Sequence, residues 1–103
     1  EILKELSATY TKIDELNYFL GRSSFEINNF EESYKAFDKI DIKNELHLRI
    51  RLEKARSLYY MKSYKTSVKE LNKILLYPIS PKVRNNIENF IKKIKLEQNR
   101  TKW

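Results

Sequence analysis

The side chains that could carry out chemistry are few in this sequence and far apart. His47 is the only imidazole and there is no cysteine, so the sequence shows no nucleophile placed beside a base and an orienting group, as covalent catalysis requires. Glu31-Glu32 and the isolated Asp14 do not converge as metal ligands do, and Glu31 and Glu32 fit the first turn of a helix. The only glycine, Gly21, leaves no glycine-rich phosphate loop. We therefore expect no catalytic residue, no metal site, no cofactor and no enzymatic activity.

Composition indicates a helical domain. The chain has 103 residues, of which 41% are hydrophobic and 34% charged, which are the values of a globular domain that buries a core. One glycine and two prolines favour long helices, and the scarcity of Val and Thr argues against strands. No apolar run approaches the ~20 residues that a membrane span needs. We predict an all-α fold.

Charge is distributed unevenly along the chain. Residues 1–42 carry 5 basic and 9 acidic side chains, a balance of −4, whereas residues 43–103 carry 16 and 5, a balance of +11. Such asymmetry is typical of a partner contact or of self-association between unlike halves. The alternative interpretation is a solvated surface in a lysine-rich composition.

A segment of the sequence recurs with a spacing of 34 residues. Residues 20–40 align with residues 54–74, and six of these 21 positions are identical. A repeat of this length with two helices in each unit is typical of a stacked helical solenoid. The aligned pairs include Gly21 with Ala55, Arg22 with Arg56, Ser23 with Ser57, Phe25 with Tyr59, Phe30 with Tyr64, Ser33 with Ser67, Lys35 with Lys69, Phe37 with Leu71, Lys39 with Lys73 and Ile40 with Ile74.

The two units resemble tetratricopeptide repeats. Leu20-Gly21 and Phe37 match that family's pattern directly, and Ser33 and Ser67 take the place of its small residue. The resemblance implies antiparallel helix-turn-helix repeats stacked as a short solenoid, and a scaffold or adaptor that binds a protein or peptide. It covers Asp14 to Pro81. The departures are Ala55 for Gly, Leu71 for Phe, Asn17 and Arg51 for Trp, Ser24 and Leu58 for Tyr, Ile40 and Ile74 for a small residue, and Pro78 one position early.

We expect a single domain over residues 1–103. Residues 2–27 form either one helix or two, and we favour a break at Thr9-Tyr10-Thr11 because Thr11 and Asp14 fit a capping pattern. Ser80-Pro81 predicts the start of the last helix. The predicted parts are 1–13, an N-terminal helix or the end of a preceding repeat; 14–44, the first repeat, with helices over 14–27 and 31–41; 45–80, the second repeat, with helices over 45–61 and from 64 to 77; 81–99, a capping helix; and 100–103, a tail.

Gly21 and Ala55 mark the places where two helices of one unit approach closely. A side chain larger than methyl at these positions would separate the helices, at a cost of roughly 1–3 kcal/mol. Asn28-Asn29 and Lys62-Ser63 are the predicted turns that follow. The residues assigned to helix packing are Leu20, Gly21, Ser33, Phe37, Ala55, Ser67 and Leu71, and the inward-facing residues include Tyr34, Val68 and Val83.

In a tetratricopeptide solenoid the first helix of each unit lines the concave face, so the resemblance implies a binding groove there. Arg22 and Arg56 are expected to be neighbours, and two guanidiniums beside aromatic rings suit a carboxylate or an acidic side chain of a peptide. The alternative is that both arginines pair with nearby acids such as Glu26 and Glu53. The predicted groove residues are Tyr18, Arg22, Phe25, Arg49, Leu52, Arg56 and Tyr59.

Three functional hypotheses follow. The first is a non-catalytic protein-interaction module, whose partner is a protein or peptide. The second is binding of nucleic acid or an anionic membrane surface through the basic half, although no RNA-binding aromatic motif accompanies the charge. The third is the periplasmic part of an outer-membrane assembly lipoprotein, which short cysteine-free tetratricopeptide chains resemble. The chain starts at Glu1 rather than Met, so we expect a processed product or an excised domain, and the compartment stays open.

Overall fold

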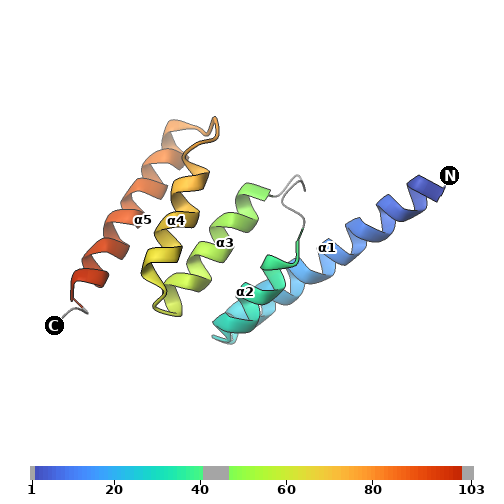
Figure 1. Ribbon diagram of the computed structural model, residues 1–103, viewed down its shortest axis with the longest axis horizontal. Coiled ribbons are helices and arrows are strands. Elements are labelled where there is room, and N and C mark those ends of the chain that lie inside the picture. The colour runs from blue at the N-terminus through green and yellow to red at the C-terminus, as the bar shows by residue number, and fades with distance from the viewer. Residues whose placement is uncertain (1, 41–46, 101–103) are drawn as a thin grey trace.

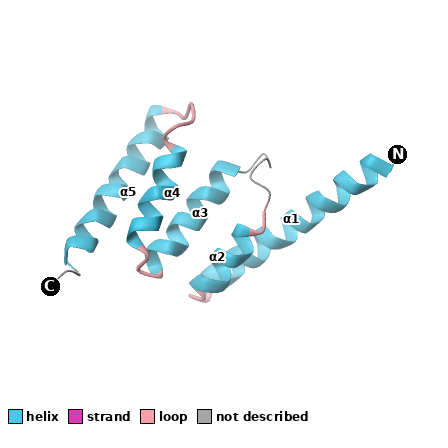
Figure 2. Cartoon of the chain, in the orientation of Figure 1, coloured by secondary structure: helices cyan, strands magenta, loops and turns pink. Residues whose placement is uncertain are grey.

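Five α-helices make up the described part of the chain, which is residues 2–40 and 47–100 of a computed structural model (Figure 1). Side chains are described for residues 13–40 and 48–100. No strand occurs in these residues, as Figure 2 shows, so the predicted all-α class is confirmed. The helices are α1 (Ile2–Glu26), α2 (Phe30–Asp38), α3 (His47–Tyr60), α4 (Tyr64–Ile74) and α5 (Pro81–Arg100).

The helices follow one another across the molecule in chain order, each beside the next (Figure 1). The result is an elongated body of 58 × 31 × 18 Å, with α1 at one end and α5 at the other. The N-terminal part of α1 extends past the other helices. Because each helix contacts its sequence neighbours, the two ends of the chain present different surfaces.

The α1/α2 pair and the α3/α4 pair are equivalent hairpins, which we call the first and the second hairpin. Each turns on a left-handed residue, Asn28 with φ 64° and Lys62 with φ 65°. The following amides make matching hydrogen bonds, from Asn29 N to Ser24 O at 2.8 Å and from Ser63 N to Leu58 O at 2.9 Å. The predicted turns are therefore confirmed, and the spacing of 34 residues is a structural equivalence.

A buried serine ties the two helices together in each hairpin. The hydroxyl of Ser33 donates to the carbonyl of Gly21 at 2.7 Å, and the hydroxyl of Ser67 donates to the carbonyl of Ala55 at 2.7 Å. Ser57 of α3 also donates to the hydroxyl of Ser33 at 3.3 Å, which links the second hairpin to the first. The small residue in the aligned pattern is thus both a spacer and a hydrogen-bond donor.

Replacing Ser33 or Ser67 by alanine is expected to reduce the free energy of unfolding by about 1 kcal/mol each, because a buried hydrogen bond between helices is lost. Urea denaturation followed by circular dichroism measures the change. Ser63→Ala is the matched control, because Ser63 precedes α4 without a capping hydrogen bond from its side chain. Ser33→Ala as stable as the parent chain would contradict this role.

The apolar core has two centres. The larger one joins Ala55, Leu71 and Ile74 of the second hairpin to a buried stripe of α5. The smaller one contains Phe37 and Ile40 of α2 and Ile50 of α3, with Tyr18 packed against it. The α5 stripe consists of Ile87, Ile91 and Ile94.

Gly21 is buried against Phe37, as predicted. A Cβ atom at Gly21 would lie 2.6 Å from Cε1 of the Phe37 ring, which is closer than real Cβ atoms approach. Tyr34, on the same helix, is only half-buried. The glycine therefore serves the contact between α1 and α2.

Three predictions about α1 and the exposed side chains are wrong. The favoured break at Thr9-Tyr10-Thr11 does not occur, because α1 is continuous over Ile2–Glu26, and threonine without glycine or proline is tolerated inside a helix. Leu20, assigned to helix packing, is half exposed, because the close contact is made one residue later at Gly21. Val83 is exposed rather than inward-facing, because it lies in the first turn of α5.

Several helix ends also differ from prediction. The fourth helix ends at Ile74 rather than near Tyr77. Pro78 disfavours the helical conformation of the residue before it, so the helix ends ahead of Tyr77. The second helix covers Phe30–Asp38 rather than 31–41, and the last one reaches Arg100, past the predicted end at residue 99. The end of the predicted first repeat, residues 41–44, and the end of the tail at 101–103 lie outside the described residues.

Candidate protein-interaction surface

A buried carboxylate lies where α3 faces α1. Glu53 is only 2% exposed, and its Oε1 accepts a hydrogen bond from Nη1 of Arg56 at 3.1 Å. Arg22 of α1 lies within the electrostatic reach of the same carboxylate. The two arginines of the aligned pattern therefore share one acidic neighbour.

Two contacts raise the pKa of Arg22 above its ordinary value. The larger effect is the hydrogen bond that its Nη1 donates to the hydroxyl of Tyr18 at 3.2 Å, and the next is the negative charge of Glu53. Glu26 adds a smaller effect of the same sign. Arg22 is thus a permanent cation, held on the side of α1 that faces α3.

Both guanidiniums lie near aromatic rings. The guanidinium carbon of Arg56 is 4.7 Å from the centroid of Phe25, and that of Arg22 is 6.0 Å from the centroid of Tyr18. These are cation–π distances, which hold the planar groups in place without using all their N–H donors. The side chain of Arg56 is partly exposed, so its remaining donors are open to a ligand.

An aromatic cluster borders the arginines. Tyr60 stacks on Phe30 with a centroid distance of 4.8 Å, and Phe25 meets both rings edge-on, at 5.1 Å from Phe30 and 5.6 Å from Tyr60. Tyr60 is half exposed. The cluster joins the ends of α1 and α3 and presents an apolar surface beside Arg56.

The structure brings together part of the predicted groove. Arg56 contacts both Glu53 and Phe25, and Arg22 lies within the electrostatic reach of Glu53. The ring of Tyr59 lies against Tyr64 and Phe90, with the amine of Lys93 at 5.5 Å, and it also meets the ring of Tyr60 edge-on at 5.1 Å. Tyr18 and Leu52 pack against the two core centres, and Arg49 is exposed.

Two residues of the surface were missed or underused by sequence reasoning. Tyr60, and not its neighbour Tyr59, meets Phe25, because the repeat register gives equivalent positions and not the contacts between units. Glu53 was considered only as a possible ion-pair partner, and the Arg56–Glu53 pair is confirmed. The sequence does contain a sign that Glu53 is unusual. Glu53 aligns with Phe19, so the second unit has a carboxylate where the first has an aromatic ring.

The outer side of α5 is a separate basic surface. Its apolar stripe is buried, while Arg84 donates to the carbonyl of Leu75 at 3.1 Å and thereby caps the end of α4. The amide of Val83 donates to the hydroxyl of Ser80 at 3.2 Å, which confirms the predicted helix start. The exposed basic residues of α5 are Lys82, Lys92, Lys93, Lys95 and Arg100.

Two features are absent from the described residues, a metal-binding group and a membrane-spanning helix. No group of three His, Asp or Glu side chains in this part of the chain is arranged to hold a metal ion. Within the same residues, no helix combines the length and the apolar character that crossing a membrane requires.

Comparison with known proteins adds no relative: no protein-family model, curated protein or solved structure matches the chain. The class defined by the fold is therefore an all-helical chain of two equivalent hairpins closed by a fifth helix. Its candidate surface is defined by geometry alone.

Proposed function

We propose that the chain is a non-catalytic protein-interaction module, built as a short tetratricopeptide-like solenoid, that binds a segment of a partner protein across α1 and α3. The support for the solenoid is the repetition of geometry every 34 residues, seen in the left-handed turn residues and in the serine hydrogen bonds. The support for binding is the arginine and aromatic surface on the first helices of the two hairpins.

The single observation that carries the proposal is the pair of guanidiniums around Glu53. Arg22 and Arg56 are held by ring contacts and share the carboxylate of Glu53 as an acidic neighbour, so the two guanidiniums are preorganised. Arginine binds carboxylates through two parallel N–H donors. Tyr60 beside them provides apolar area. The fitting ligand is a peptide segment that carries a carboxylate next to an apolar side chain.

Removing both arginines is expected to weaken partner binding about tenfold or more, because each charge-assisted hydrogen bond contributes roughly 1.5–3 kcal/mol. The partner is first recovered with the immobilised chain as bait. Its affinity is then measured by calorimetry for the parent chain and for Arg22→Ala with Arg56→Ala.

The matched control is Lys92→Ala with Lys93→Ala, which removes the same charge from α5. We expect this control to bind within about twofold of the parent chain, a change of less than 0.5 kcal/mol. Unchanged affinity of the arginine variant, with helix content intact by circular dichroism, would exclude the α1–α3 surface.

A second candidate is binding of an anionic surface through α5, which the exposed lysines favour. An amphipathic helix lies on a membrane with its apolar face down, and in α5 that face is buried in the core through Ile87, Ile91 and Ile94. The lysines alone remain for contact. Such binding would fall steeply with added salt, and this salt dependence distinguishes it from the first proposal.

A further inference from the structure

The outer face of α1 is apolar and uncovered. Leu16 is 69% exposed and Phe19 is 71% exposed, with Ile13 and Leu20 each about half exposed beside them. Their spacing of three and four residues places them on one side of the helix. Burying apolar side chains of this size is favourable, so this face is a candidate for a contact.

The equivalent face of α3 is covered. Ile50 aligns with Leu16 and is 3% exposed, and it packs with Phe37 and Ile40 of α2. Lys54 aligns with Leu20, is mostly buried, and donates to Asp38 of α2 at 2.8 Å. The helix that precedes α3 thus shields this face, although it is more polar than the exposed face of α1.

The same relation holds in part at α5. Ile87 lies 68 residues after Phe19, two repeat lengths, and it is buried in the core that α4 shares. On α3 this face is covered by the preceding amphipathic helix α2. On α5 the position that aligns with Phe19 is covered, whereas Glu88, which aligns with Leu20, is exposed. By analogy with α3, an amphipathic helix is the occupant that suits the exposed face of α1.

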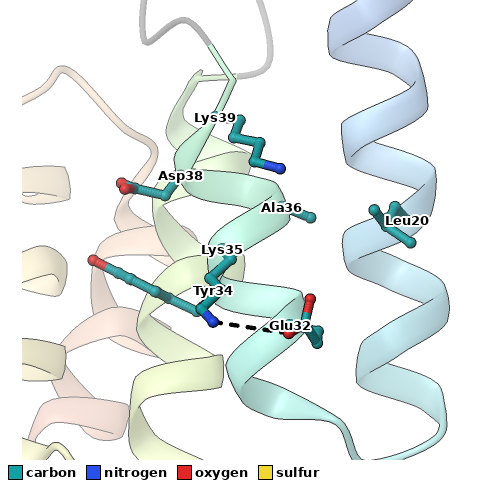
Figure 3. Close-up of a pocket in the computed structure, with 7 residues that line it drawn as sticks. All are labelled: Leu20, Glu32, Tyr34, Lys35, Ala36, Asp38 and Lys39. Atoms are coloured by element: carbon teal, nitrogen blue, oxygen red, sulfur yellow. Dashed lines mark ion pairs between the residues drawn. The ribbon is translucent and has the colours of Figure 1, made fainter.

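A shallow pocket extends the exposed face toward α2. It has a volume of about 280 Å³ and is lined by residues of α1 and α2. Figure 3 shows Leu20 and Ala36 pointing toward each other across it, whereas Tyr34 and Asp38 point away from α1. Glu32, at the rim, pairs with Lys35 at 3.8 Å. At this pocket Ala36 is 2% exposed and Leu20 is 50% exposed, so Leu20 is the apolar side chain that a docked helix could contact.

The charges near the outer face of α1 indicate which charge a docked helix should carry. Asp14 and Glu15 lie within residues 13–20, the stretch of α1 that carries the exposed apolar side chains, and this stretch has no basic side chain, so a helix with basic flanks is favoured. The contact between α2 and α3 already follows this rule, since the acidic Asp38 meets the basic Lys54. We propose that the outer face of α1 docks an amphipathic helix of a partner protein, with apolar residues at i, i+3, i+4 and i+7 and lysine or arginine on its flanks.

The test uses two synthetic helical peptides with the same leucine pattern, one with lysine and one with glutamate at the other positions. Fluorescence anisotropy measures their binding to the parent chain and to Leu16→Ser with Phe19→Ser. We expect the Leu/Lys peptide to bind at least about tenfold more tightly than the Leu/Glu peptide, and the double variant to lose about tenfold or more in affinity. Leu96→Ser, an exposed leucine on α5, is the control and retains full affinity.

Three results would overturn the inference. The first is that the double variant binds the Leu/Lys peptide as tightly as the parent chain does. The second is that the parent chain binds the Leu/Glu peptide as tightly as the Leu/Lys peptide. The third is a dimer of the parent chain in light scattering that Leu16→Ser with Phe19→Ser converts to monomer, because a second copy then covers the face. The surface around Glu53 is not involved, so failure here leaves the proposed function intact.

Discussion

Gly21→Ala is expected to lower the free energy of unfolding by about 1–3 kcal/mol, the cost of overpacking a well-filled core. The added Cβ would meet three atoms of the Phe37 ring at 2.6 to 2.8 Å, so either the ring or α2 must move. In a chain of this size, 1 kcal/mol corresponds to a shift in Tm of about 4–8 °C. Thermal and urea denaturation measure the loss, with helix content unchanged.

The second hairpin supplies the compensating change. There Ala55 faces Leu71, where the first hairpin has Gly21 and Phe37, and both Ala55 and Leu71 are fully buried. Phe37→Leu is therefore expected to rescue Gly21→Ala, so that the double variant is more stable than the sum of the single changes predicts. If Gly21→Ala instead stabilises the chain, helix propensity outweighs the contact and the close approach is not limiting.

Ile94→Ala is expected to cost about 2–5 kcal/mol, because its side chain fills the core between α5 and the second hairpin. Ile94 is fully buried and clusters with Leu71 and Ile74. A chain with only two hairpins depends on its closing helix, since the stacked units cover each other's apolar faces. Chemical denaturation gives the value.

Leu96→Ala, two residues further along α5, is the matched control. Leu96 is exposed, and a surface substitution of this kind changes stability by less than about 0.5 kcal/mol. Equal effects at the two positions would show that α5 does not close the core.

Local signals predicted the hairpins correctly. The sequence predicts turns at Asn28 and Lys62-Ser63, a helix start at Ser80-Pro81 and a close approach at Gly21, and the structure has all four. Each depends on the chemistry of a few adjacent residues or on the register of the repeat. These features are visible in the sequence because they are fixed by backbone sterics and capping.

Contacts between units could not be predicted in the same way. The register places Tyr59 opposite Phe25, but the packing of α3 on α1 brings Tyr60 there instead. Leu20 is half exposed because no helix among the described residues packs on the outer face of α1. The pattern within the repeat does not predict this. The continuity of α1 through Thr9-Tyr10-Thr11 shows that a weak capping pattern does not end a helix.

The central claim is that a partner binds across α1 and α3. Amide chemical-shift mapping by NMR tests it most directly, with the labelled chain titrated by the recovered partner segment. We expect the shifts to concentrate at Arg22 and Phe25 of α1 and at Arg56 and Tyr60 of α3, and to be absent along the outer side of α5. Shifts confined to the lysines of α5, with α1 and α3 unchanged, would contradict the claim.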